Sequence, residues 1–180
     1  MLDKILVAID ESYASQCAFE TALKLADALD AELLLVHVLD IFSSEGPGNP
    51  FVEINPCLSE HSESKRRKKY EARMTEFISR YDALLKEKQT EAKVVSVDVN
   101  AVQPYGRPGP AICKAASEND VDLIVIGNRD RSTLKELVPG SVSNYVVHRA
   151  PCSVTVVHPD SYDKAKSDAS HSEFALAEMS

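Results

Sequence analysis

Five short apolar runs, separated by stretches of a different periodicity, constrain the fold of this chain more than any other feature. A near-continuous apolar run of this length is typical of a strand buried on both faces of a parallel sheet. The runs are Lys4–Asp10, Leu33–Leu39, Val94–Val99, Val121–Gly127 and Ser153–Val157. The third run alternates with polar residues, which indicates a position nearer an edge of the sheet.

The segments between these runs repeat apolar residues at helical spacing. We expect a first helix capped by Ser12, a long amphipathic helix over about 59–88, a short one from Pro110 to Asn119, and a last one beginning near Ser141. Strands that alternate with helices predict an α/β fold, with a five-stranded parallel sheet covered by helices on both faces.

The order of the strands decides where such a sheet binds a ligand, because the crevice forms where the order reverses. In the order 3-2-1-4-5, the crevice lies between the first and fourth strands and faces Asp10 and the loop that opens at Gly127. In the order 2-1-3-4-5, it lies between the first and third strands, near Asp10 and Asn100. Periodicity alone leaves both orders open.

Composition limits the class of protein and its partners. The chain has 180 residues and a formal net charge of −8, which suits one domain and disfavours non-specific binding to nucleic acid or anionic membrane. No apolar run approaches the roughly 20 residues of a membrane helix, and no leader-like segment is evident, so we expect a cytoplasmic protein. The basic run Lys65–Lys69 is interpreted as a solvated helix face.

Common catalytic and metal-binding signatures are missing. The chain has no GxGxxG after its first strand, no GK[ST], no GxSxG and no HExxH, which excludes the usual dinucleotide sites and P-loop ATPases. Its cysteines form no zinc-like spacing with its histidines, and only Cys57, in a Pro/Gly-rich loop, is a thiol worth testing for reactivity. We therefore expect no catalytic residues and no enzyme.

The segment from Gly127 to Ser143 has the features of a phosphate-binding loop. It begins with a glycine at a strand end and closes with Gly140-Ser141 at a helix start, where unpaired amides and the helix dipole favour an anion. Ser141 and Ser143 add hydroxyl donors, and Arg129 and Arg131 add positive charge.

Several separated motifs agree in order with one family. They are Ile5–Asp10, Val36–Val38, Gly106–Pro108, Ile126–Gly127, Gly140–Ser143 and Ala150–Val154. On these motifs the chain resembles the universal stress protein family from Lys4 to Pro159. The resemblance implies one Rossmann-like domain (adenine nucleotide alpha hydrolase-like) over 1–159 with a sheet of order 3-2-1-4-5. From composition, we expect the Gly-, Pro- and Ser-rich segment 41–58 to be a flexible insertion and the polar tail 160–180 to be mobile.

Family members that bind ATP carry the pattern G-x2-G-x9-G-[ST], whose spacing recurs here from Gly127 to Ser141. The resemblance implies that adenine and ribose lie among Ile9, Asp10, Val38 and Ile126. It implies that the phosphates are held by Gly127, Arg129, Gly140, Ser141, Val142 and Ser143. Asp10 would bind the sugar or lie near a Mg²⁺ or Mn²⁺ ion that bridges the phosphates of ATP or another adenine nucleotide.

One loop position departs from the pattern, because Asp130 stands where the second glycine is expected. A carboxylate about 5 Å from a phosphate oxygen opposes binding by roughly 3 kcal/mol at an effective dielectric near 20, about a hundredfold in affinity. Three interpretations follow: an adenine-nucleotide-binding stress regulator without fast catalysis, an interaction protein of the same fold that binds no nucleotide, or a slow ATPase.

The fifth strand would end the sheet and leave an open edge. In the family this strand pairs with its twin, so the resemblance implies a homodimer with Val154 and Val156 in the contact. We expect neither nucleic acid nor membrane as a partner.

Overall fold

The computed structural model describes residues 1–43, 46–48, 60–128 and 141–159. Within these residues, five strands form one parallel sheet of order β3-β2-β1-β4-β5. The strands are β1 (Lys4–Ala8), β2 (Glu32–Val36), β3 (Val99–Val102), β4 (Leu123–Gly127) and β5 (Ser153–Val157). The predicted α/β fold is confirmed, and so is the strand order 3-2-1-4-5 that the family resemblance implies. The strand order therefore reverses between β1 and β4.

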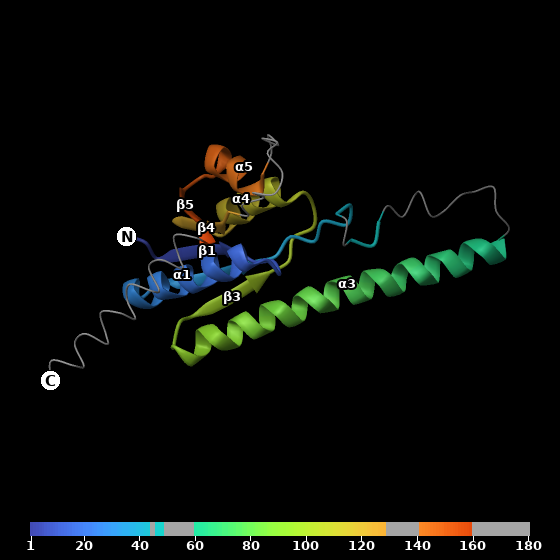
Figure 1. Ribbon diagram of the computed structural model, residues 1–180, viewed down its shortest axis with the longest axis horizontal. Helices are drawn as coiled ribbons and strands as arrows, with labels where there is room; N and C mark the ends of the chain where they lie inside the picture. Colours follow the sequence, from blue (N-terminus) through green and yellow to red (C-terminus); the bar gives the residue numbers. More distant parts are fainter. Residues whose placement is uncertain (44–45, 49–59, 129–140, 160–180) are drawn as a thin grey trace.

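Helices cover both faces of this sheet (Figure 1). They are α1 (Tyr13–Leu29), α3 (Glu60–Val94), α4 (Pro108–Glu118) and α5 (Val142–Arg149). Because side chains alternate along a strand, Ile5 and Val7 pack with α1 in one core cluster, whereas Leu6 packs with Ile112 of α4 and Val146 of α5 in the other.

The helix boundaries agree with the capping signals in the sequence. Ser12 caps α1 by accepting a hydrogen bond from the Ser15 amide, and Ser141 caps α5 by accepting one from the Asn144 amide. Helix α4 ends at Glu118 with Asn119 as its C-cap, as expected, but it begins at Pro108 rather than at Pro110.

The prediction of a strand over Val94–Val99 is wrong for most of that segment. Helix α3 continues through Val94, and β3 begins only at Val99. Ala92, in the last turn of α3, is fully buried in the core, and the chain then turns through Ser96 at a φ of 65°. Tertiary packing of the helix end therefore overrides the strand preference of the valines.

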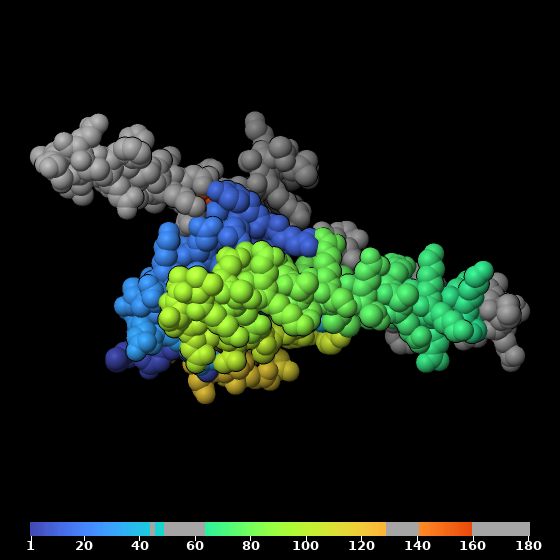
Figure 2. Space-filling model, turned by 90° about the horizontal axis from the view of Figure 1, so that it is seen from below, coloured from blue at the N-terminus to red at the C-terminus, as the bar shows by residue number. Residues whose placement is uncertain are grey.

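Helix α3 extends well beyond the sheet (Figures 1 and 2). Its packed part begins at Phe77, whose ring contacts Tyr81 edge-on, and continues through Leu85 to Ala92. The basic run Lys65–Lys69 lies on the projecting part, and four of its five side chains are exposed. Among the described residues, no helix is both long enough and apolar enough to cross a bilayer.

Most of the insertion predicted at 41–58 and the whole tail at 160–180 lie outside the described residues, as does Cys57.

Candidate functional site

Asp10 lies at the carboxyl end of β1, in the turn that leads into α1. Its carboxylate accepts a hydrogen bond from the Ser12 amide at 2.8 Å, and its own amide donates to the Ser15 hydroxyl at 2.9 Å. These bonds hold the half-buried carboxylate beside the N-terminus of α1, at the crevice that the strand order predicts.

Gly127 ends β4, the strand that neighbours β1, and has a structural role that the sequence did not reveal. A Cβ atom at this position would overlap the carbonyl oxygen of Ala14 in α1. A glycine is therefore required so that the first turn of α1 can pack against the end of β4.

The first turn of α5 contains the two predicted phosphate-binding serines, and a hydrogen bond joins them. Their hydroxyl oxygens are 3.2 Å apart, and Ser141 also accepts the Asn144 amide at 3.2 Å. The hydroxyl of Ser143 donates at 3.3 Å to Oδ1 of Asn128, the residue immediately after β4. Hydroxyls, an amide side chain and the start of a helix thus meet at one point, which is a suitable environment for an anion.

Asn128 and His158 complete this cluster, and the sequence reasoning missed both. Nδ2 of Asn128 lies 3.3 Å from Nδ1 of His158. A signal was available: each residue directly follows a strand, and Gly127 pairs with Val157 in the sheet. Once the strand order places β5 beside β4, the residues that follow this pair, Asn128 and His158, lie side by side.

The four residues assigned to adenine and ribose do not share one face of the sheet. Ile9 packs in the core cluster under α1, whereas Val38 and Ile126 pack in the cluster under α4 and α5. The carbonyl of Ile9 is 2.8 Å from Nδ1 of buried His37, whose ring stacks on Tyr81 at 3.7 Å. Since a carbonyl only accepts, His37 carries a proton on Nδ1 and holds the end of β1 against α3.

Of the remaining predicted residues, Val142 is half-buried and packs against the second core cluster. Arg129, Asp130 and Gly140 lie outside the described residues. No group of three or more histidine, cysteine or acidic side chains able to hold a metal ion occurs in the described part of the chain.

Helix dipoles reinforce the chemistry of this end of the sheet. Both α1 and α5 begin here, so the positive ends of their dipoles and their unpaired amides face the crevice. The described side chains at this end of the sheet are hydroxyls, an amide, a histidine and one carboxylate, and together with the helix N-termini they suit the binding of an anion.

Comparison with known proteins agrees with this geometry. The family model described as "Universal stress protein family" matches residues 1–158. The chain belongs to the universal stress protein family. The universal stress protein YxiE of Bacillus subtilis is 32% identical over 160 residues, which cover 87% of this chain and 99% of that protein.

Two solved structures of the family share the fold. A universal stress protein in complex with cAMP has a TM-score of 0.61 at 24% identity, covering 88% of this chain and 98% of that one. A universal stress protein family protein from Arabidopsis thaliana with AMP bound has a TM-score of 0.56 at 21% identity, covering 87% and 91%.

Proposed function

We propose that this universal stress protein is an adenine-nucleotide-binding regulator of the stress response without fast catalysis. The observation that carries the proposal is the cluster of Ser141, Ser143 and Asn128 at the N-terminus of α5. It lies just beyond the end of β4, the neighbour of β1, which Asp10 follows. Two proteins of the same fold were solved with cAMP and with AMP bound, which supports an adenine nucleotide as the ligand class.

Calorimetric titration with ATP, ADP, AMP and adenosine, each with and without Mg²⁺ or Mn²⁺, tests this function. We expect the nucleotides to bind more tightly than adenosine, because only they carry the phosphates that the α5 cluster suits. If none of the four binds at millimolar concentration, the proposal is wrong and the alternative of a non-nucleotide-binding interaction protein is favoured.

The proposal predicts no rapid ATP hydrolysis, and Asp10 is the acidic side chain with which to test it. Its carboxylate accepts the Ser12 amide through Oδ1 beside the start of α1. We expect ATP turnover of wild type and of Asp10→Ala to be equally slow in a phosphate-release assay. A wild-type rate of one per second or more that Asp10→Ala abolishes would instead indicate an ATPase.

The negative charge of Asp130 is expected to affect the affinity for ATP. If its repulsion limits binding, Asp130→Gly tightens ATP affinity by about one to two orders of magnitude. Asp120→Gly is the matched control, because Asp120 is exposed at a φ of 51°, so that this change removes one negative charge elsewhere without straining the backbone. Equal ATP affinity of Asp130→Gly and wild type would refute the electrostatic argument.

We also propose a homodimer through β5. This strand is at one end of the sheet order and pairs with β4 alone among the described residues. Val154 and Val156 are half-buried against the second core cluster. The β5 strand of a second copy would therefore pair with the backbone hydrogen-bonding edge of β5. Light scattering after size-exclusion chromatography tests the proposal, and a monomer at micromolar concentration would contradict it.

A further inference from the structure

Glu11, the residue that directly follows Asp10, is bound to α3 by Arg80. Nε of Arg80 donates to Oε1 of Glu11 at 2.6 Å, and Nη2 of Arg80 donates to Oε2. Two such bonds between a guanidinium and a carboxylate fix the direction of both side chains as well as their separation. The turn after β1 is therefore tied to a residue 69 positions further along the chain.

Ile9, on the other side of Asp10, is held to the same part of α3. Its carbonyl oxygen lies 2.8 Å from Nδ1 of His37, and the ring of His37 stacks on Tyr81, the neighbour of Arg80. The guanidinium carbon of Arg80 lies 5.5 Å from the centre of the Tyr81 ring. Two adjacent residues of α3 thus hold both neighbours of Asp10.

These two attachments differ in what they do for the fold. His37 and Tyr81 are buried, so their contacts belong to the core. The side chains of Arg80 and Glu11 are 49% and 40% exposed, and an ion pair at such a surface position contributes little to stability. The main effect of the Arg80 pair is therefore on the orientation of the turn.

Glu11 lies inside the hydrogen-bonded turn that fixes the Asp10 carboxylate. Oδ1 of Asp10 accepts the Ser12 amide at 2.8 Å, and this bond closes a ring with Glu11 in its middle. A movement of the Glu11 backbone turns this ring and the carboxylate with it. The ion pair with Arg80 opposes that movement.

We infer that Arg80 is a positioning residue, which acts through Glu11 to hold the Asp10 carboxylate toward the sugar hydroxyls of a bound nucleotide. The inference rests on the proposed nucleotide binding and names the part of the ligand that depends on α3. Without the ion pair, the turn adopts more orientations, and a nucleotide must select the competent one at a cost in affinity. A ligand without sugar hydroxyls has no such requirement.

Titration of wild type and Arg80→Met with AMP and with its 2′,3′-dideoxy analogue, both without metal ion, tests the inference. The two ligands carry the same phosphate, so the lost positive charge of Arg80 acts equally on both. We expect the loss of affinity to be about three- to fivefold greater for AMP than for the analogue, the size expected of an exposed ion pair. An equal loss for both ligands would overturn the inference.

Three further variants assign the effect to the ion pair. Glu11→Gln should show the same difference between the two ligands, and combining it with Arg80→Met should not enlarge that difference. A difference that grows additively in the double variant would overturn the role of the pair. Arg67→Met is the matched control, because it breaks an exposed ion pair with Glu71 on the same helix, and its affinities for AMP and the analogue should stay in the wild-type ratio.

A second measurement needs no ligand. Hydrogen exchange of the Ser12 amide, which the Asp10 carboxylate accepts, should be about threefold or more faster in Arg80→Met than in wild type. The Asn144 amide, which Ser141 accepts at the start of α5, should keep its wild-type rate. An unchanged Ser12 rate would overturn the inference. If wild type binds neither ligand, the proposed function fails, and the Ser12 rate still decides whether Arg80 positions the turn.

Discussion

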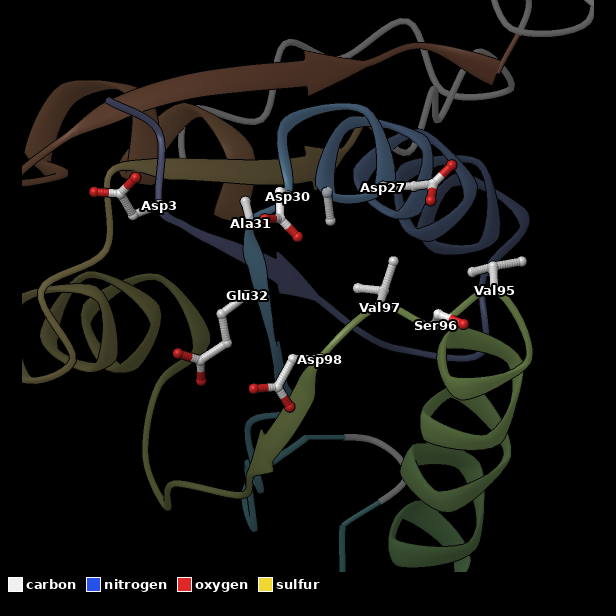
Figure 3. A pocket seen from close by; sticks show the side chains of 10 residues that line it. Asp3, Asp27, Asp30, Ala31, Glu32, Val95, Ser96, Val97 and Asp98 are labelled. Carbon is white, nitrogen blue, oxygen red and sulfur yellow. The ribbon is translucent and has the colours of Figure 1, made fainter.

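The two edges of the sheet have opposite chemistry, although the same strands build both. At the carboxyl edge, α1 and α5 begin with serine caps, and the described cluster there consists of hydroxyls, an amide and a histidine. At the amino edge, a hollow of about 470 Å³ is lined by Asp3, Asp27, Asp30, Glu32 and Asp98 (Figure 3). One edge suits an anion, and the other repels it.

The direction of the chain explains this difference. Each crossover helix runs antiparallel to the strands it connects, so helix N-termini gather at the carboxyl edge and helix C-termini at the amino edge. Carboxylates at the amino edge also hold strand starts in place. Asp122 accepts the amides of Asp3 and Lys4, and Glu32 binds the Lys4 ammonium at 3.1 Å and the Asn100 amide at 2.7 Å. Asp122 and Glu32 therefore have structural partners at this edge.

The largest expected effect is a loss of stability when the packing at the carboxyl edge is disturbed. Gly127→Ala should destabilise the protein by about 3 kcal/mol, because the new methyl group would overlap the backbone carbonyl of Ala14 and α1 would have to move. Urea unfolding followed by circular dichroism measures this change, since the chain has no tryptophan.

Ser153→Ala, at an exposed position of β5, is the control for Gly127→Ala and should change stability by less than about 0.5 kcal/mol. A Gly127→Ala variant as stable as this control would show that α1 does not pack against the end of β4 as described.

An intermediate effect separates capping from binding at the carboxyl edge. Ser12→Ala and Ser141→Ala each remove a cap and should each cost about 1 kcal/mol in the free energy of unfolding. Only Ser141→Ala should also weaken AMP binding, because only that hydroxyl belongs to the cluster with Ser143. Equal losses of AMP affinity in both variants would argue against α5 as the phosphate site.

The smallest effect concerns the amino edge and depends on pH. Hydrogen bonds from the Asp3 amide and then the Lys4 amide lower the pKa of Asp122 below its ordinary value. A lowered pKa stabilises the folded protein above about pH 4, and this contribution disappears as the pH falls through the folded-state pKa. We expect wild type to be slightly more stable than Asp122→Asn at pH 7, with the difference closing toward pH 3.

Urea midpoints at pH 7, 5, 4 and 3 measure that difference. Asp98→Asn is the control, since it removes one negative charge from the hollow at the same edge of the sheet without removing the bonds that Asp122 accepts from Asp3 and Lys4. A stability difference for Asp122→Asn that stays constant down to pH 3 would contradict the role given to these amides.

Local patterns predicted the elements well where sequence and packing agree. The cap residues Ser12 and Ser141 and the run Ser153–Val157 were identified correctly, because each depends on neighbours in the chain. The prediction of a strand beginning at Val94 was wrong, because the burial of Ala92 extends α3 to Val94, a residue whose side chain favours a strand. For the site, the serines were predicted from the helix start, but Asn128 and His158 were not.

By itself, the amino-acid sequence determined the α/β alternation, the start of α5 at Ser141 and the glycine at the end of β4, since periodicity, capping and backbone freedom are local properties. The tertiary structure decided the rest. Periodicity left the neighbour of β1 open, and the structure shows it to be β4, as the family resemblance implied; only the structure placed Asn128 beside His158, 30 positions apart in the chain. It also showed that Gly127 makes room for α1. These features depend on which strands lie side by side, and that is settled only when both faces of the sheet are packed.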